Sequence, residues 1–174
     1  LALTRFGKID ILVNNAGVSN PPKLFIDTPE DEWNIPIKTN IFGLLNCTKV
    51  VLKHMIARKS GKIINISSSA AKTGGQHVAV YGATKAAIVG FTKGLAAEVA
   101  NLGINVNSVA PGVGDTGFTA QAPPGFLEMY TSLIPLGRIT TPRDIGAMVA
   151  FLASDLADDI VGQVFSVDGG STMY

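Results

Sequence analysis

Hydrophobic residues along this sequence gather into short runs that are separated by longer segments with helical spacing. Four runs have the length and composition of buried strands: residues 9–13, 62–66, 104–109 and 163–167. They are mostly apolar rather than alternating, which is typical of a parallel sheet that is covered on both faces. The alternation of such runs with helical segments predicts βαβ units and a single α/β domain over residues 1–174.

Three long segments have the spacing of helices: residues 31–59, 80–101 and 142–154. Pro36 indicates an irregularity in the first of them, and Gly61 is expected to end it. Gly103 is expected to stop the second helix, and Thr141 is expected to be the N-cap of the third. Residues 113–136 are rich in Gly, Pro and Thr without a clear period, so we expect a loop that covers or lines a binding site.

Composition and charge exclude several classes of protein. Hydrophobic residues make up 47% of the chain, but its most apolar stretch without a charge, residues 145–154, is only half of the roughly 20 residues that cross a bilayer. We therefore expect no membrane span. The 14 basic and 13 acidic residues leave a net charge of +1 without a basic run, so no nucleic-acid partner is expected.

Cysteine and histidine usage adds two further expectations. The single cysteine, Cys47, excludes an internal disulfide and indicates a reducing compartment such as the cytoplasm. Without a partner, Cys47 is expected to be a buried structural residue. The two histidines, His54 and His77, lack the spacing of metal ligands, and no metal site is predicted.

The first candidate for chemistry is the segment YGATK at 81–85. Tyr81 and Lys85 stand four residues apart, so on a helix they share one face at a distance of one turn. A phenol with a pKa of about 10 is a weak base at neutral pH, and a neighbouring ammonium is expected to lower the pKa of Tyr81. Tyr81 could then act as a general acid or base. The same spacing is common on solvated helix faces, so it carries weight only beside other motifs.

Small and polar residues follow three of the predicted strands, at the sheet edge where ligands bind in α/β proteins. Ser68 comes directly after the second strand, and its hydroxyl could orient a substrate oxygen. The segments NNAG at 14–17 and PGVGDT at 111–116 could let the backbone approach a ligand closely. Each of these alone is also compatible with an ordinary turn.

Together these motifs resemble the short-chain dehydrogenase/reductase family over essentially the whole chain, and most closely its β-ketoacyl-carrier-protein reductase type. The matching segments are NNAG at 14–17, TNI at 39–41, NISS at 65–68, YGATK at 81–85, VNSVAPG at 106–112, FLASD at 151–155 and residues 162–170. The resemblance implies a doubly wound, Rossmann-type parallel sheet with helices on both faces. It also implies an oxidoreductase that transfers a hydride between NAD or NADP and a small-molecule alcohol or ketone.

By position, the resemblance implies a catalytic tetrad of Asn40, Ser68, Tyr81 and Lys85. Tyr81 would exchange a proton with the substrate oxygen, and Ser68 would orient that oxygen. Lys85 would hold the nicotinamide ribose, and Asn40 would support a water that relays protons. The residues expected to contact the cofactor are Asn15, Ala16, Gly17, Tyr81, Lys85, Pro111, Gly112, Gly114 and Thr116. Gly114 departs from the Ile or Val that the family often has there, so only a backbone contact is expected from it.

The Gly-rich cofactor turn of the family does not occur before residue 14, and residues 1–8 read as the end of a helix. The chain therefore resembles the C-terminal catalytic part of such an enzyme, without its N-terminal strands. The strand at 9–13 is then expected to lie at a sheet edge with uncovered apolar side chains.

Two alternatives remain open, and the family also implies a quaternary state. One alternative is an inactive fragment or an oligomerisation module that keeps the four residues by descent. A weaker one is an epimerase or a dehalogenase of the same family. The resemblance further implies a homo-oligomer, either a tetramer or a dimer. The sequence does not distinguish NAD from NADP, nor does it identify the substrate.

Overall fold

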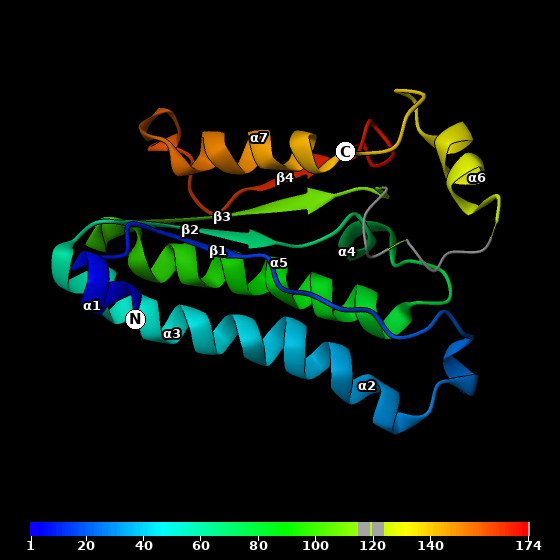
Figure 1. Cartoon of the computed structure of the whole chain (residues 1–174), viewed down its shortest axis with the longest axis horizontal. Coiled ribbons are helices and arrows are strands. Elements are labelled where there is room, and N and C mark those ends of the chain that lie inside the picture. The colour runs from blue at the N-terminus through cyan, green and yellow to red at the C-terminus, as the bar shows by residue number, and fades with distance from the viewer. Residues whose placement is uncertain (115–118, 120–123, 174) are drawn as a thin grey trace.

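The computed structural model of the chain describes residues 1–114, 119 and 124–173. Its centre is a parallel sheet of four strands in the order β1-β2-β3-β4. The strands are β1 (Ile11–Asn14), β2 (Gly61–Ile66), β3 (Ile104–Pro111) and β4 (Val164–Val167). Figure 1 shows the strands side by side, with their carboxyl ends on one side of the molecule. The predicted parallel sheet and its four strands are confirmed.

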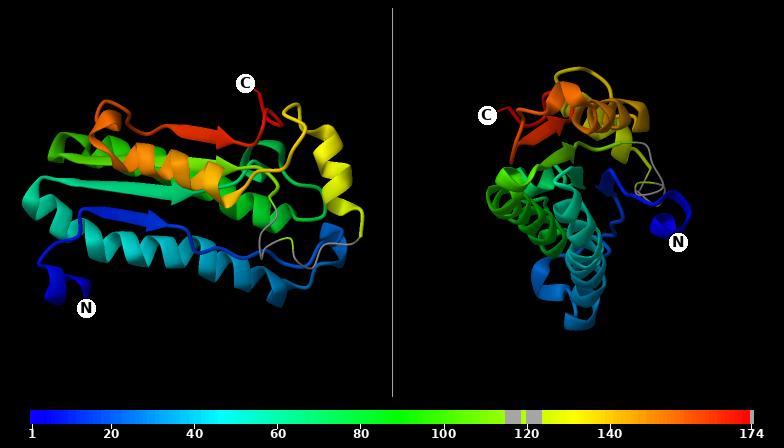
Figure 2. Two further views of the ribbon diagram at one scale, coloured as in Figure 1. Left: turned by 45° about the horizontal axis from the view of Figure 1, so that its top comes forward. Right: turned by 90° about the vertical axis from the view of Figure 1, so that its left-hand side faces the viewer.

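Helices cover both faces of this sheet, as the resemblance implied. α3 (Leu44–Arg58) and α5 (Ala79–Val99) pack on one face, and α7 (Pro142–Ala153) packs on the other, as Figures 1 and 2 show. The shorter elements are α1 (Ala2–Phe6), η1 (Phe25–Asp27), α2 (Glu30–Pro36), η2 (Ile37–Gly43), α4 (Ala70–Thr73), η3 (Ala100–Leu102), α6 (Phe126–Leu133) and η4 (Asp155–Ala157). Among the described residues, every helix is too short or too polar to cross a bilayer.

One apolar cluster on each face of the sheet holds the layers together. The cluster under α3 and α5 consists of Val51, Met55, Ile63, Leu95, Ala96, Val99, Ile104 and Val106. The cluster under α7 consists of Ile64, Ile66, Val109, Leu152 and Ala157. Consecutive residues of a strand point to opposite faces, so β2 contributes Ile63 to one cluster and Ile64 to the other. This is why the central strands are apolar without alternation.

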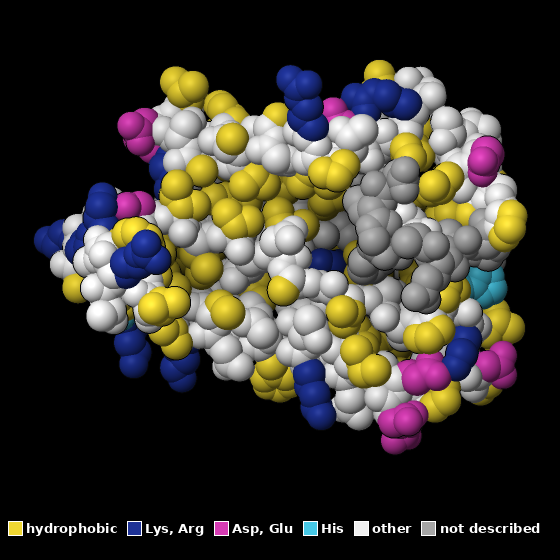
Figure 3. Space-filling view, viewed as in Figure 1, with side chains coloured by type: hydrophobic (Ala, Val, Ile, Leu, Met, Phe, Trp, Pro, Cys, Tyr) yellow, Lys and Arg dark blue, Asp and Glu magenta, His cyan; other side chains and the backbone are white. Residues whose placement is uncertain are grey.

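β1 lies at one edge of the sheet and is less covered than its neighbour. Ile11 and Val13 are 45% and 39% exposed, whereas Ile63 and Ile64 of β2 are each 1% exposed. In Figure 3, hydrophobic side chains gather on the surface between α7 and β1. The expected edge position of this strand, with uncovered apolar side chains, is confirmed.

The predicted helix at 31–59 is one continuous helical segment with the predicted irregularity. α2 ends at Pro36, the π-helical turn η2 follows, and α3 begins at Leu44. The prediction that Gly61 ends the helix is wrong, because Lys59 takes the left-handed conformation (φ 52°) at the end of α3. Gly61 instead opens β2, where a Cβ would lie 2.4 Å from the Met55 sulfur. A close approach of two elements therefore accounts for this glycine, and the helix end does not.

Other expectations had mixed outcomes. α6 lies inside the 113–136 segment, so the expectation of a loop is wrong for those eight residues. Cys47 is exposed on α3, contrary to the expected burial. Thr141 is the N-cap of α7, as predicted: its hydroxyl accepts from Asp144 N, and the Asp144 carboxylate accepts from Thr141 N.

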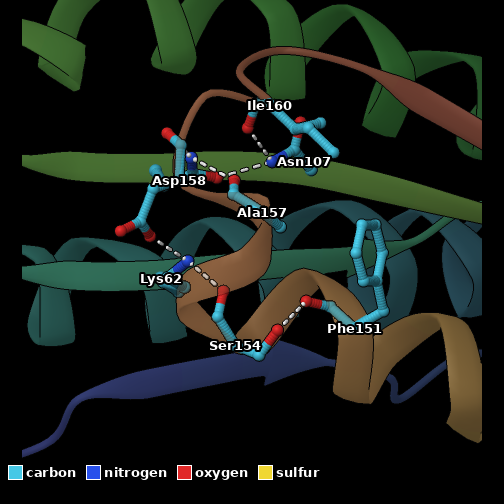
Figure 4. Close-up of polar contacts among 8 residues, drawn as sticks. Lys62, Asn107, Phe151, Ser154, Ala157, Asp158 and Ile160 are labelled. Carbon is cyan, nitrogen blue, oxygen red and sulfur yellow. Dashed lines mark hydrogen bonds and ion pairs between the residues drawn. The ribbon is translucent and has the colours of Figure 1, made fainter.

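The connection from α7 to β4 is tied to the two central strands (Figure 4). Lys62 Nζ donates to the Ser154 carbonyl at 2.5 Å and pairs with the Asp158 carboxylate at 2.6 Å. Asn107 donates to the Ile160 carbonyl at 2.6 Å and accepts from Gln163 N at 2.9 Å. These bonds hold the start of β4 against β3, which places the end of β4 at the same sheet edge as the other strands.

Gly103→Ala is expected to lower the free energy of unfolding by about 2–4 kcal/mol. Gly103 has a φ of 80°, and a Cβ there would lie 2.3 Å from the Lys59 carbonyl oxygen. The substitution therefore adds left-handed strain to a backbone clash, and urea unfolding measures the loss. Gly94→Ala is the control, because a Cβ on Gly94 of α5 meets nothing within 4 Å. Equal urea midpoints for the two variants would contradict the prediction.

Candidate active site

The four predicted catalytic residues come from three segments of the chain that end at the same place. Ser68 follows β2, Asn40 lies in η2, and Tyr81 and Lys85 lie in the first two turns of α5. In Figure 2 (left) the arrowheads of the strands all point to the end of the sheet where α5 begins. This carboxyl edge is where ligands bind in open α/β sheets.

Lys85 is a buried cation in the middle of this group. Its residue is 4% exposed, and its Nζ donates to the carbonyl of Ile66, the last residue of β2, at 2.9 Å. Nζ lies 5.7 Å from the centroid of the Tyr81 ring, so the predicted shared helix face is confirmed. Burial lowers the pKa of Lys85 from 10.5 to about 8, because a buried ammonium loses its hydration.

Tyr81 and Ser68 are joined by a side-chain hydrogen bond. The Ser68 hydroxyl also accepts from Ala70 N at 3.1 Å, which fixes it at the start of α4. Burial raises the pKa of Tyr81, and the bond with Ser68 acts in the opposite, lowering direction. The expected lowered pKa of Tyr81 is therefore not found. The phenolate would lose its hydration on burial, and this effect is larger than that of the hydrogen bond with Ser68.

Asn40 is 1% exposed and is held by three hydrogen bonds. Its Oδ1 accepts from Val18 N at 2.8 Å, and its Nδ2 donates to Val18 O at 2.9 Å. The same Nδ2 donates to the Thr84 hydroxyl at 2.9 Å. Asn40 thus links the segment after β1 to the first turn of α5. It sits in a π-helical turn, a distortion that often marks functional positions in helices.

Gly17 is closely approached by two of these side chains. A Cβ on Gly17 would lie 3.1 Å from Lys85 Nζ and 3.5 Å from Asn40 Oδ1. Any larger residue would therefore press against the buried ammonium. The segment that contains Gly17 begins with Asn15 and Ala16, which are both exposed and so accessible to a ligand.

The other predicted cofactor contacts lie at the end of β3. Pro111 is the last residue of that strand, and its carbonyl accepts from Ser69 N at 2.8 Å. Gly112 donates to Val167 O at 3.0 Å, and a Cβ on it would lie 2.8 Å from the Asp168 Cβ. Gly114 forms an isolated parallel bridge to Thr140. Thr116 lies outside the described residues.

A chain of polar side chains, of which the sequence reasoning did not identify Thr48 and Thr92, connects the sheet to the two helices on one of its faces. Asn14 Nδ2 donates to the Thr48 hydroxyl at 3.0 Å and to Asn65 Oδ1 at 2.8 Å. Asn65 Nδ2 donates in turn to the Thr92 hydroxyl at 2.9 Å. These bonds connect α3, β1, β2 and α5. An asparagine at the end of an otherwise apolar strand is the sequence signal for such partners, since a buried amide needs hydrogen bonds.

Comparisons with known proteins show what the chain as a whole is similar to. The family model described as enoyl-(acyl carrier protein) reductase matches residues 2–172. A curated 3-oxoacyl-[acyl-carrier-protein] reductase of Synechocystis is 43% identical over 173 residues, which cover 99% of this chain and 68% of the relative. The chain thus spans about two thirds of the length of that relative.

Solved structures show the same likeness in three dimensions. A gluconate 5-dehydrogenase from Burkholderia cenocepacia in complex with NADP and tartrate has a TM-score of 0.93 and 36% identity, over 98% of this chain and 67% of the other. A 3-ketoacyl-(acyl-carrier-protein) reductase from Brucella melitensis complexed with NADH has a TM-score of 0.94 and 32% identity, over 99% and 71%. This chain belongs to the short-chain dehydrogenase/reductase family of oxidoreductases.

Proposed function

We propose that this chain carries the catalytic centre of an NAD(P)-dependent oxidoreductase that transfers a hydride between the nicotinamide and an alcohol or ketone. The supporting observation is the meeting of Ser68, Tyr81, Lys85 and Asn40, drawn from three segments, at one point of the carboxyl edge. Burying the Lys85 ammonium disfavours folding, as its lowered pKa indicates. Groups that are perturbed at such a cost are typical of functional sites.

In the proposed reaction, Tyr81 donates a proton to the substrate oxygen during reduction and takes it back during oxidation. Its raised pKa keeps the phenol protonated at neutral pH, which suits the donor role. The Ser68 hydroxyl, already bonded to Tyr81, would orient the same substrate oxygen. The two hydroxyls therefore define the place of the reacting oxygen.

The residues around Lys85 fit a nicotinamide cofactor. An ammonium has three N–H donors, and within the described part of the chain one of them is used, by Ile66 O. The others can bind ribose hydroxyls, while the segment 15–17, whose first two residues are exposed, and the end of β3 can lie along the cofactor. When bound, the cofactor supplies or accepts the hydride. Relatives of solved structure contain NADP or NADH, and either is compatible with these residues.

The hydrogen bonds of Asn40 support its proposed role of holding a water. Both donors of Asn40 Nδ2 are engaged, but its Oδ1 accepts one bond, from Val18 N, and has a second lone pair. A water that donates to this oxygen could accept a proton from the neighbouring Lys85 ammonium. Such a water would carry protons from Lys85 toward solvent.

The proposal is tested by assaying the full-length natural protein for oxidation of NADH and NADPH with a panel of ketones that includes 3-oxoacyl thioesters and keto-sugar acids. These two substrate classes come from the names of its relatives. We expect turnover with at least one ketone. If the protein binds cofactor but turns over none of the carbonyl compounds, the alternative holds, namely a binding or oligomerisation module that keeps the four residues by descent.

Three further features belong to the same proposal. Residues 1–174 would form one domain, the catalytic part of the enzyme. A homo-oligomer, either a dimer or a tetramer, would cover exposed apolar side chains such as Val50 and Phe42 on the α3 side. A single cysteine, free and exposed, supports a cytoplasmic location, where thiols stay reduced.

A further inference from the structure

Thr84 lies between Tyr81 and Lys85 on α5 and is not one of the four proposed catalytic residues. It is 2% exposed, so its hydroxyl is shielded from water. The hydroxyl accepts from Asn40 Nδ2 at 2.9 Å and donates to the Tyr81 carbonyl at 2.8 Å. One small side chain therefore connects Asn40 directly to the backbone of Tyr81.

We propose that Thr84 is a positioning residue that sets the first two turns of α5, and with them Tyr81 and Lys85, against Asn40. The inference rests on the proposed function, since it assigns Thr84 a role only through those three residues.

The geometry gives this role to the hydroxyl and not merely to the bulk of the side chain. A threonine hydroxyl has one proton, and here it is directed to the Tyr81 carbonyl, which leaves a lone pair for Asn40 Nδ2. Asn40 is itself locked to Val18 by two bonds. A chain of hydrogen bonds through Thr84 and Asn40 thus connects the backbone of Tyr81 to the segment after β1 that contains Gly17.

The register of α5 matters because both proposed reactive groups project from it. Tyr81 must keep its hydrogen bond to Ser68, while Lys85 must keep its Nζ at the Ile66 carbonyl. These partners lie at the end of β2 and just after it, whereas Asn40 lies in η2. The hydrogen bond between Asn40 and Thr84 holds the start of α5 to η2. Without this bond, Tyr81 and Lys85 can shift relative to the substrate oxygen.

Thr92 provides a matched control within the same helix. It is 0% exposed, accepts from Asn65 Nδ2 at 2.9 Å and donates to the Ile88 carbonyl at 2.8 Å. Thr84 and Thr92 therefore make the same pair of bonds, to a buried asparagine and to a carbonyl in the preceding turn. They differ in that Thr92 lies two turns farther along α5, away from Tyr81.

The experiment compares Thr84→Val and Thr92→Val in the full-length natural protein, since valine keeps the shape of threonine and removes the hydroxyl. We expect Thr84→Val to lower kcat about tenfold, the effect of losing one hydrogen bond of ordinary strength, with the KM for cofactor changed less than about twofold. Both valine variants are expected to lower the thermal midpoint by a similar amount. Thr92→Val should leave kcat nearly unchanged. Thr84→Ser, which restores the hydroxyl, should restore kcat.

Other outcomes overturn the inference. It fails if Thr84→Val leaves kcat unchanged, if both valine variants lower kcat equally, or if Thr84→Ser remains as slow as Thr84→Val. If Thr84→Val does not fold, Thr84→Ala applies the same test, because a water can enter the space that it leaves. Tyr81→Phe, assayed in parallel, separates the two levels. An active Tyr81→Phe enzyme refutes the proposed function, whereas an inactive one beside a normal Thr84→Val refutes only the role of Thr84.

Discussion

Tyr81→Phe is expected to lower kcat by about 10²–10⁴-fold, the usual contribution of a general acid or base. Phenylalanine keeps the ring, which is held beside Lys85 Nζ at 5.7 Å, and removes only the hydroxyl that bonds to Ser68. Cofactor affinity should change little, because Lys85 and the 15–17 segment remain in place. Steady-state rates and the dissociation constant for NAD(P)H, measured on the same preparation, check both parts of the prediction.

The pH dependence of the wild-type enzyme provides a second check on Tyr81. Because burial raises its pKa, Tyr81 is protonated throughout the neutral range. Reduction of a ketone needs the phenol and should therefore be insensitive to pH near neutrality. Oxidation of an alcohol needs the phenolate and should become faster as pH rises. A Tyr81→Phe enzyme that retains wild-type kcat in both directions would remove Tyr81 from the mechanism.

Periodicity predicted the sheet well because the physical cause of each strand is local. Residues of β2 and β3 must be apolar on both sides, since clusters pack against both faces of the sheet. The second predicted helix, which comprises α5 and η3, stops before Gly103 as expected. Gly103 has a left-handed conformation (φ 80°), which glycine adopts without strain. Pro36 likewise signalled the break after α2. The π-helical turn that follows it, in which Asn40 bonds to Val18 and Thr84, was not predicted.

The errors have other causes, and the first of them concerns a distance between segments. Gly61 is glycine because Met55 lies against it, and only the folded chain brings the Met55 sulfur to that point. α6 was missed because the Gly and Pro residues around it dominated the pattern, although Phe126 and Tyr130 stand one turn apart and their ring centroids lie 4.7 Å apart in a tilted arrangement. Cys47 was assigned to the interior by residue type alone, yet it lies on the outer side of α3.

The meeting of the candidate site residues at one sheet edge was predictable, but their electrostatics was not. The four-residue spacing places Tyr81 and Lys85 together whatever the rest of the fold does. Whether the pKa of Tyr81 is raised or lowered depends on how far the fold removes its hydroxyl from water. The sequence contains no measure of that burial. The polar ladder from Thr48 through Asn14 and Asn65 to Thr92 likewise required the register of β1 against β2.

Lys85→Met is expected to abolish activity and, at pH 7, to raise the free energy of unfolding. The shift in the pKa of Lys85 from 10.5 to about 8 corresponds to a cost of about 3 kcal/mol for the buried charge. Methionine removes this cost and fills a similar volume, although it loses the bond to Ile66 O, worth about 1 kcal/mol. We expect urea unfolding to show a net rise of about 1–2 kcal/mol in the free energy of unfolding. Together with a fall in kcat of at least about 10²-fold, this would show that Lys85 serves the reaction at the expense of stability.

The sign of the pH dependence makes this prediction specific to the Lys85 charge. Below about pH 8 both folded and unfolded chains carry the proton, so the folded state bears the full cost of the buried ammonium. Between about pH 8 and 10.5 the unfolded chain binds more protons than the folded chain, so the wild-type gains stability with rising pH relative to Lys85→Met. The advantage of the variant should therefore be largest at pH 7 and smaller at pH 10. Lys93→Met, on the exposed face of the same helix, is the control and should differ little from wild type at either pH. An advantage of Lys85→Met that stays constant with pH would mean that packing, and not the buried charge, sets the stability at this position.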